Sequence, residues 1–198
     1  MSKVSTTMYN ITEISERIGA MRDLCGYTIE EMAKATNTTV EEYENCEAGK
    51  KDFSFTFLYK CAEKFGIDMV ELLTGENPHL TDFTVVHDGK GLPIRRRSGF
   101  EYFHLASYFK GKISEPFLVK APYREEEQDR EIHTSVHDGQ EFDYVLSGSL
   151  KFVYDGHEEN LIEGDSVYYD SGKPHGMIAT SKDGCTFLAV VMKEGSKR

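Results

Sequence analysis

The pattern of hydrophobic residues changes at Gly75, and this change divides the chain into two parts that fold differently. Before Gly75, apolar residues recur every three or four positions, as they do on one face of a helix. After segment 76–82, which contains an Asn-Pro pair, they fall into short β-rich runs separated by turn residues. We therefore predict a helical domain over residues 1–75, a linker over 76–82 and an all-β domain over 83–198.

Start and stop signals predict five helices in the first part. An apolar stripe over residues 11–21 marks the first helix, and Thr-x-x-Glu capping boxes at 28–31 and 39–42 open the second and third. Two more helices follow over residues 57–66 and 68–75, each ending at a glycine. Helices this short bury their apolar faces against one another, so the sequence predicts a bundle.

Short β-rich stretches without helical periodicity follow the linker. They lie at residues 84–86, 102–109, 117–119, 141–146, 150–154, 166–169 and 187–192. Turn pairs such as Ser147-Gly148 and Asp155-Gly156 separate them, whereas the highly charged segment 124–131 is predicted to be a solvated loop. Evenly spaced short strands indicate a closed β-barrel or jelly roll, which makes the fold class α+β.

The sequence contains no feature of a membrane or secreted protein. No apolar run approaches the ~20 residues of a membrane span, and residues 1–10 are polar without a signal-peptide core. The cysteines form no C-x-x-C pair, and Cys25, Cys46 and Cys61 each lie among apolar residues of a predicted helix, where a free thiol packs as a small hydrophobe. We expect a cytoplasmic protein with reduced cysteines.

The spacing of residues 14–22, 28–33, 39–49 and 65–75 resembles the helix-turn-helix domain of phage-repressor-type regulators, the XRE family. The resemblance implies that the third helix enters the major groove of DNA. It also implies an ion pair between Arg22 and Glu47 that holds the first helix to the third. Carried over by position, the DNA-contacting residues are Thr39, Val40, Glu41 and Asn45 toward the bases, and Lys50 and Lys51 toward the backbone.

The charge of this domain opposes DNA binding. The whole chain carries a net charge of −11, and residues 1–75 contain 8 basic against 13 acidic side chains. The third helix holds Glu41, Glu42, Glu44 and Glu47 and no basic residue, although DNA affinity depends mainly on neutralising phosphates. Two interpretations follow: a DNA-binding head, or a packing or oligomerisation module that kept the shape and lost the DNA.

Two segments of the β-rich part resemble the motifs of the cupin superfamily. Residues 135–148 resemble the first motif and residues 164–175 the second. The resemblance implies a jelly-roll barrel that holds a divalent metal, with His137 and Glu141 from the first motif and His175 from the second as ligands. The domain prediction therefore becomes a five-helix helix-turn-helix bundle followed by a cupin domain.

The ligand residues support a metal site independently of the resemblance. His137 and Glu141 lie four positions apart with Gly139 between them, so that a bend can aim both inward, and His175 follows a proline. Two imidazoles and one carboxylate with open positions suit Fe(II) and also accommodate Zn, Mn or Ni. The alternative is a metal-free barrel with residual polar groups in its mouth.

The sequence departs from the cupin pattern at two positions. Ser135 replaces the first histidine of the usual pair, where it could hold a metal-bound water, and Ala179 replaces the usual asparagine. We expect Ser135, Asp143 and Tyr144 to line a ligand pocket, Asp143 because it shares a strand face with the glutamate ligand. The basic cluster at residues 95–97 either contacts an anion or DNA backbone, or belongs to a solvated loop.

The whole layout resembles the helix-turn-helix–cupin regulators, which implies a DNA-binding transcriptional regulator that senses a small molecule, with no catalytic residue assigned. The alternative is a mononuclear non-haem iron oxygenase. The hydroxypropylphosphonate epoxidase family shares this architecture and a His-Glu-His triad, but its active-site lysine and tyrosine correspond here to Gly26 and Leu105. A third interpretation is a ligand-binding protein with neither activity. We expect a homodimer or homotetramer, with DNA and a small molecule as partners and no membrane.

Overall fold

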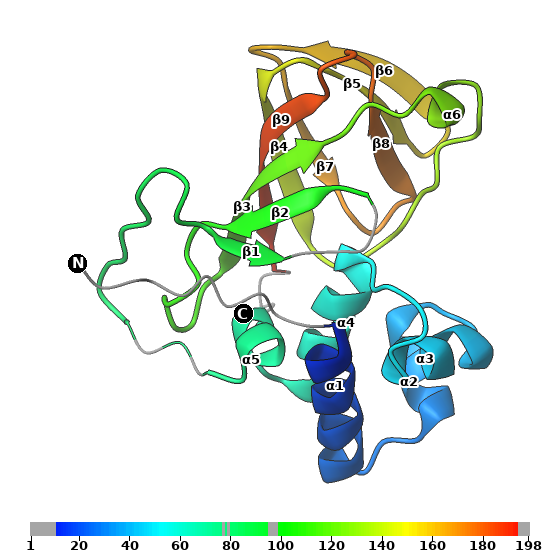
Figure 1. The fold of residues 1–198 in the computed structure, drawn as a ribbon, viewed down its shortest axis with the longest axis vertical. Helices are drawn as coiled ribbons and strands as arrows, with labels where there is room; N and C mark the ends of the chain where they lie inside the picture. The colour runs from blue at the N-terminus through cyan, green and yellow to red at the C-terminus, as the bar shows by residue number, and fades with distance from the viewer. Residues whose placement is uncertain (1–10, 77, 79, 95–98, 194–198) are drawn as a thin grey trace. The chain divides into compact units, whose positions relative to one another are not determined.

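The computed structural model describes residues 11–76, 78, 80–94 and 99–193 (Figure 1). The chain divides into two compact units, a helical unit and a β-rich unit, which are considered separately below. The basic cluster at 95–97 and two positions of the predicted linker, Asn77 and His79, lie outside the described residues. Among the residues described, no helix is long and apolar enough to cross a membrane.

The helical unit contains the five predicted helices in the predicted order. They are α1 (Ile11–Cys25), α2 (Ile29–Thr36), α3 (Val40–Glu47), α4 (Phe55–Phe65) and α5 (Met69–Thr74). Both capping boxes form: the Thr28 hydroxyl accepts from the Glu31 amide while the Glu31 carboxylate accepts from the Thr28 amide, and Thr39 and Glu42 repeat this exchange. These reciprocal bonds satisfy amides that the first helical turn leaves without partners, which explains why each helix begins there.

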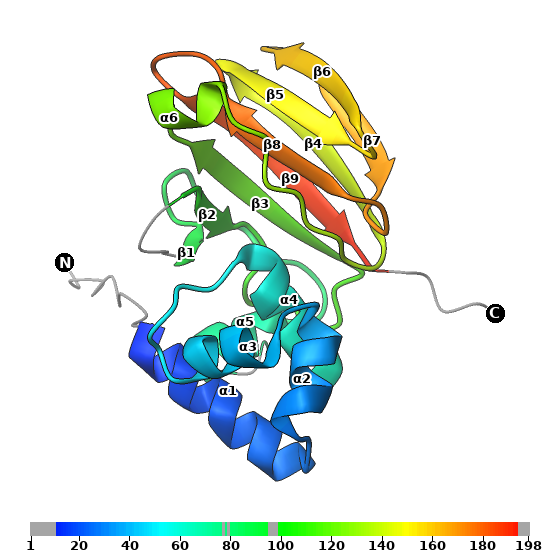
Figure 2. The same cartoon turned by 90° about the vertical axis from the view of Figure 1, so that its right-hand side faces the viewer.

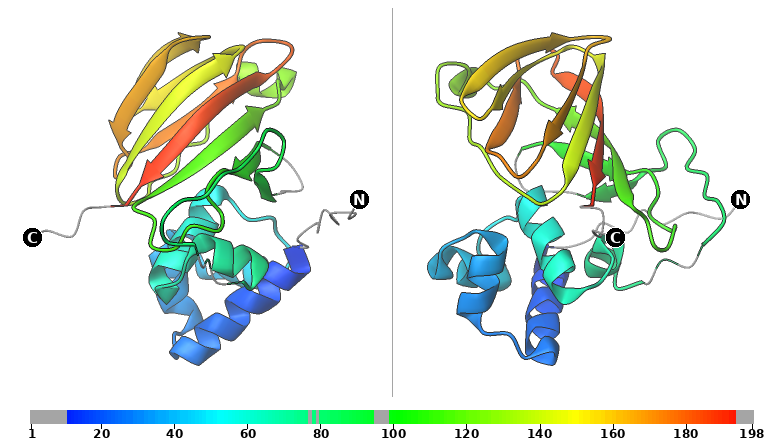
Figure 3. Two further views of the ribbon diagram at one scale, coloured as in Figure 1. Left: turned by 90° about the vertical axis from the view of Figure 1, so that its left-hand side faces the viewer. Right: turned by 180° about the vertical axis from the view of Figure 1, so that it is seen from behind.

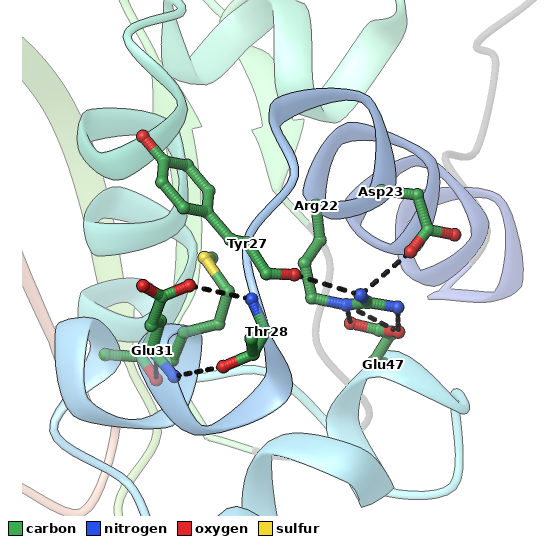
Figure 4. A network of polar contacts seen from close by, with 8 residues as sticks. Arg22, Asp23, Tyr27, Thr28, Glu31 and Glu47 are labelled. Atoms are coloured by element: carbon green, nitrogen blue, oxygen red, sulfur yellow. Dashed lines mark hydrogen bonds and ion pairs between the residues drawn. The ribbon is translucent and has the colours of Figure 1, made fainter.

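An ion pair joins the first helix to the third, as the helix-turn-helix resemblance implies (Figure 4). Arg22 Nε donates to Glu47 Oε2 at 2.9 Å and Arg22 Nη2 donates to Oε1 at 2.9 Å. The Tyr27 carbonyl and the Asp23 carboxylate contact the same guanidinium. The side chains of Arg22 and Glu47 are only 16% and 18% exposed, so the two-pronged pair holds α1 against α3 with little screening by water.

Replacing Arg22 with Met should destabilise the helical unit by about 1–3 kcal/mol, because it leaves the Glu47 carboxylate partly buried without its partner. Urea unfolding followed by far-UV circular dichroism measures the loss. The matched control is Lys51→Ala, which removes a pair whose side chains are about half exposed and should cost less than about 0.5 kcal/mol. Equal losses in the two variants would show that the Arg22 pair is not structurally special.

The β-rich unit consists of two sheets (Figure 2). Its strands are β1 (Leu92–Ile94), β2 (Glu101–His104), β3 (Ser114–Ala121), β4 (Gln140–Ser147), β5 (Ser149–Tyr154), β6 (His157–Ile162), β7 (Ser166–Asp170), β8 (His175–Ala179) and β9 (Cys185–Met192). One sheet has the order β1-β2-β3-β9-β4-β7 and the other β6-β5-β8. Alternate residues of β3 and β9 are buried, among them Phe117, Val119, Phe187 and Val191, which places an apolar core on one face of the larger sheet. The predicted α+β fold is confirmed.

Several predicted strand boundaries were wrong. Residues 84–86 form no strand, the stretch 102–109 is a strand only as far as His104, and the solvated loop at 124–131 contains the short helix α6 (Glu125–Gln128). Strands β1, β6 and β8 were not predicted. Strand β6 has a mostly exposed, polar sequence, so it lacks the hydrophobic alternation on which the prediction relied. It forms because Asp155-Gly156 makes a two-residue hairpin turn with positive φ at both positions.

The environment of the cysteines differs from the expectation at one position. Cys46, Cys61 and Cys185 are buried, but Cys25 is exposed at the end of α1. The apolar spacing of the first helix extends to Met21, and Cys25 lies one turn later, beyond the residues that pack. Burial raises the pKa of the Cys46 and Cys61 thiols and raises the pKa of Cys185 to about 11.

Cys25 should therefore be the cysteine that a thiol reagent modifies in the native protein. Since the thiolate is the reactive form, a raised pKa leaves the three buried thiols protonated at a pH near 8. Mass spectrometry after brief alkylation should find one modified site in the native protein and four after unfolding in guanidinium chloride. Cys25→Ser should remove the native reaction, and rapid native labelling of Cys61 would contradict the packing described here.

Candidate functional site

Three side chains that the sequence predicts as metal ligands converge in the β-rich unit. His137 lies in the loop before β4, Glu141 is the second residue of β4, and His175 is the first residue of β8. Reciprocal backbone hydrogen bonds between Ser135 and His175, at 2.8 and 3.0 Å, attach this loop to the start of β8. The site therefore draws one ligand from each of the two sheets and one from the loop that precedes β4 and is hydrogen-bonded to the start of β8.

The geometry of the three groups suits a metal ion. One ligand atom from each residue lies within 4.8 Å of the other two. The distance from His137 Nε2 to Glu141 Oε2 is 3.2 Å and that from His175 Nε2 to the same oxygen is 4.0 Å. His137 is 3% exposed, His175 6% and Glu141 9%. Two imidazoles and one carboxylate are thus gathered in a site largely shielded from water.

A backbone carbonyl fixes which nitrogen His175 presents. His175 Nδ1 lies 2.8 Å from the Lys173 carbonyl, and because a carbonyl oxygen only accepts, this Nδ1 carries the hydrogen, which leaves the lone pair of His175 Nε2 toward Glu141. His137 lies between two acceptors, with Nδ1 3.2 Å from the Asp138 carbonyl and Nε2 3.2 Å from Glu141 Oε2. Desolvation also lowers the pKa of His175, favouring the neutral imidazole that binds metals.

A second carboxyl group, that of Asp143, lies buried beside Glu141. Asp143 is 1% exposed, and its Oδ2 accepts a hydrogen bond from the Tyr169 hydroxyl at 3.2 Å. Its Oδ1 is buried without a hydrogen-bond partner in the described part of the chain. Burial, and then the neighbouring charge of Glu141, raise the pKa of Asp143 well above its usual range. The position of Asp143 on the glutamate's strand face agrees with the alternation expected from the sequence.

These polar groups fit a bound divalent cation. Among the described residues, the hydrogen bonds and ion pairs of Glu141 and Asp143 are made with histidines and a tyrosine rather than with lysine or arginine. Two buried carboxyl groups that lack a permanently charged partner are costly to keep ionised. A divalent ion between His137, Glu141 and His175 would supply the missing positive charge.

Tyr169 belongs to this site, although the sequence did not single it out. Its Cα pairs with that of Glu141 across strands β4 and β7, its hydroxyl contacts Asp143, and its ring centroid lies 5.0 Å from that of His175. The cross-strand register was the missing information, because it depends on which strands pair. Hydrogen bonding and ring packing together hold Asp143 and His175 in place.

The structure does not bring Tyr144 to the site. Tyr144 follows Asp143 on β4 and is 39% exposed on the opposite face of the strand, because successive side chains of a strand point to opposite faces. The expected pocket role of Tyr144 was therefore wrong. Ser135 lies beside the site through its backbone bonds to His175.

The residues predicted to contact DNA lie on or next to α3, and most of them are exposed. Val40 is 41% exposed, Glu41 and Lys50 are exposed, and Asn45 is half-buried. The Thr39 hydroxyl caps α3, and Lys51 Nζ lies 2.8 Å from Glu42 Oε1. Lys51 therefore already has an acidic partner, a pairing that the sequence did not indicate.

The acidic residues of α3 are not equivalent in the folded protein. Glu42 pairs with Lys51, which lowers the pKa of the Glu42 carboxyl, and Glu47 pairs with Arg22. Glu41 and Glu44 are exposed. The negative charge that α3 presents to a partner is thus smaller than the sequence alone indicates.

A buried ionic group near β2 and β3 was also missed. His104 is fully buried, and its Nε2 lies 2.6 Å from Glu115 Oε2, while its Nδ1 accepts from the Ala106 amide. Lys112, itself buried, lies 3.8 Å from the same carboxylate. The sequence does not indicate this contact, because the partner of His104 lies 11 positions away on the neighbouring strand.

Comparisons with known families agree with both domains. Residues 15–78 match a family described as a helix-turn-helix domain, and residues 124–191 match the cupin domain family. A search of curated protein sequences gave no match.

Solved structures of two other proteins are similar to this chain. An HTH_3 family transcriptional regulator from Vibrio cholerae is 18% identical, with 96% of this chain and 100% of that chain covered and a TM-score of 0.66. Hydroxypropylphosphonic acid epoxidase from S. wedmorenis is 19% identical, with 94% of this chain and 100% of that chain covered and a TM-score of 0.48. The likeness to the regulator shows the fold. The chain therefore contains a helix-turn-helix domain over residues 15–78 and a cupin domain over residues 124–191.

Proposed function

We propose that the protein is a DNA-binding transcriptional regulator whose cupin domain binds a divalent metal and senses a small molecule. The observation that carries the proposal is the convergence of His137, Glu141 and His175 in a cupin domain that shares its chain with a helix-turn-helix domain. A regulator of this kind works on DNA inside the cell, so a cytoplasmic location is part of the proposal.

The DNA-binding part of the proposal rests on the geometry of α3. Reciprocal capping and the Arg22–Glu47 pair hold this helix firmly, and Val40, Glu41 and Asn45 lie along it with side chains at least partly accessible. An asparagine amide can make two hydrogen bonds to adenine, and a glutamate can accept one from cytosine. Lys50 is the exposed basic residue just beyond the helix that is best placed to contact phosphate.

The metal would be held by His137, Glu141 and His175, with Asp143 behind Glu141. When bound, a divalent ion supplies a Lewis acid with open positions for an oxygen- or nitrogen-bearing ligand. The chain's own residues orient that ligand: Tyr169 and Asp143 provide hydrogen-bonding groups beside the triad, and Ser135 lies at its edge. Such a ligand regulates DNA binding if its affinity differs between two arrangements of the protein.

A mononuclear iron enzyme is the second candidate. The observation that favours it is the donor set itself, since two histidines and one carboxylate also serve iron-dependent oxygenases. The exposed Glu41 and Glu44 of the third helix, which oppose DNA binding, favour it further. Metal content and DNA affinity separate the two candidates: tight iron without DNA binding at low salt supports the enzyme.

Replacing Glu141 with Ala should weaken divalent metal binding by at least about 100-fold, because it removes the charged member of the triad. Titration of the chelator-treated protein with Fe(II), Zn(II), Mn(II) and Ni(II), by calorimetry and thermal shift, measures affinity and stabilisation. His133→Ala is the matched control, since His133 is an exposed histidine near the site. Unchanged metal affinity in the Glu141 variant would exclude this triad as the ligand set.

Asn45→Ala should abolish sequence-selective DNA binding, because a lost two-pronged base contact costs about 1–3 kcal/mol of discrimination. The probes are duplexes selected by the wild-type protein from a randomised pool, measured by fluorescence anisotropy at several salt concentrations. Lys50→Ala is the contrasting variant: it should weaken all duplexes alike and reduce the salt slope by about one. If the wild type retains no duplex even at low salt, the head does not bind DNA and the regulator proposal fails.

A further inference from the structure

A buried ionic cluster centred on Glu115 lies at the start of strand β3, outside the candidate metal site. Glu115 is 1% exposed, and its Oε2 lies 2.6 Å from His104 Nε2 and 3.8 Å from Lys112 Nζ. Its Oε1 lies 3.7 Å from Lys193 Nζ. Apolar residues of the same size are often at least as stabilising as a buried ion pair, so the role of this cluster is better sought in the segments that it positions.

The cluster positions the bend that follows β2. The Ala106 amide donates to His104 Nδ1 at 2.9 Å, so the hydrogen of this imidazole is on Nε2, which donates to Glu115. Lys112 Nζ donates to the Phe109 carbonyl at 3.0 Å. Two side chains that contact the Glu115 carboxylate therefore hold the two ends of this bend.

The bend holds the chain at Leu80, the residue with which the β-rich unit begins. The Leu80 amide donates to the Tyr108 carbonyl at 2.9 Å, and the Lys110 amide donates to the Leu80 carbonyl at 2.8 Å. The preceding residues belong to the helical unit, so these two bonds act where the chain first passes from one unit to the other. We call residues 106–110 and Leu80, joined in this way, the linker clamp.

A row of cross-strand neighbours connects the ionic cluster to the candidate metal site. Val191 of β9 pairs with Glu141 of β4 on one side and with Glu115 of β3 on the other. The left view of Figure 3 shows β9, in red, beside β3, in green, in the larger sheet. Directly opposite residues project to the same face with Cβ atoms about 4.5–5.5 Å apart, so one buried side chain, that of Val191, separates the two glutamates.

Strand β9 also reaches the cluster through the residue that follows its end. Lys193 lies two positions after Val191, and besides its ion pair with Glu115 its amide donates to the Ile113 carbonyl at 3.1 Å. A shift of β9 against β3 therefore changes both the packing of Val191 and the ion pair of Lys193. Protein interiors are close-packed and transmit such shifts rather than absorb them.

Filling the metal site changes the state of β4, where this row begins. The buried carboxyl groups of Glu141 and Asp143 lack a permanently charged partner among the described residues, which is costly. A divalent ion would remove that cost and join Glu141 to His137 and His175. A strand that is held more firmly lowers the ordering cost of the groups packed against it, which include Val191.

We propose that the linker clamp is coupled to the metal site through Val191, so that metal binding tightens the hold of the clamp on Leu80. The proposal rests on the metal-binding part of the proposed function. It adds the route by which the β-rich unit acts on the chain that leads to the helix-turn-helix domain. Coupling between two equilibria is reciprocal, so opening the clamp must weaken metal binding by up to the factor by which the metal closes it.

The first test follows hydrogen exchange at the clamp in the full chain. Zn(II) is the probe, because two imidazoles and a carboxylate accommodate it and it is diamagnetic. NMR resolves the amides of Leu80 and Lys110, both of which donate hydrogen bonds within the clamp. Saturating zinc should slow their exchange at least about 5-fold in the wild type. It should slow their exchange less in Val191→Ala, which removes the packing between the two glutamates.

The second test opens the clamp and measures metal affinity. Lys112→Met keeps an apolar side chain of similar length but removes the ammonium group that holds the Phe109 carbonyl. Exchange at Leu80 and Lys110 should become faster, and calorimetry should find zinc binding weakened at least about 5-fold. Circular dichroism and thermal unfolding establish that the variant is folded. If it is not, Glu115→Gln repeats the test with a side chain of the same shape.

The matched control is Lys182→Ala, which removes an ion pair with Glu125 whose side chains are 73% and 77% exposed. Its zinc affinity and its exchange at the clamp should equal those of the wild type. Zinc binding that leaves clamp exchange unchanged, equal slowing in Val191→Ala, or wild-type zinc affinity in Lys112→Met would overturn this inference and leave the proposed function intact. A wild type that binds no zinc would overturn the triad as a metal site together with the inference.

Discussion

The reciprocal backbone hydrogen bonds between Ser135 and His175 are the constraint on which the candidate metal site depends. They attach the loop carrying His137 to the first residue of β8, so that two ligands 38 positions apart in the printed sequence face the same glutamate. The attachment requires a close approach of the two segments at Gly176, where a Cβ atom would lie 2.3 Å from the His133 carbonyl oxygen. Gly139, at φ 98°, then turns the chain from the loop into β4. Backbone geometry, rather than contacts among the ligands themselves, creates the site.

The fold was largely predictable because its helices carry local signals. A capping box spans only four residues, and a terminal glycine directly follows its helix. Because such signals are local, five helices could be placed from the sequence alone. Strands depend on partners that are distant in the chain. Residues 84–86 have strong β propensity but no strand partner among the described residues, whereas the polar strand β6 forms because it pairs with β5. High β propensity allows a segment to form a strand, but the segment forms one only where a neighbouring strand pairs with it.

Only the site residues that follow from motif spacing or from strand alternation could be predicted. Spacing identified His137, Glu141 and His175, and alternation placed Asp143 beside Glu141. The same alternation, applied consistently, would have placed Tyr144 on the far side. Tyr169 and the His104–Glu115 pair could not be found in this way, because each depends on the register between neighbouring strands. Such contacts are fixed by the assembled sheet and leave no local trace in the sequence.

Part of the acidity of α3 serves the stability of the helical domain, and this bears on whether the helix can bind DNA. Glu42 caps the helix and pairs with Lys51, and Glu47 holds Arg22, so two of the four glutamates stabilise the domain itself. The same pairing also engages Lys51, one of the two lysines predicted to contact the DNA backbone. A single head of this kind has little electrostatic affinity for DNA and must rely on base contacts. Two helix-turn-helix domains joined in a dimer bind one duplex with a combined affinity that far exceeds that of either, so the weak electrostatic attraction of α3 favours a dimer as the form in which the proposed regulator binds DNA.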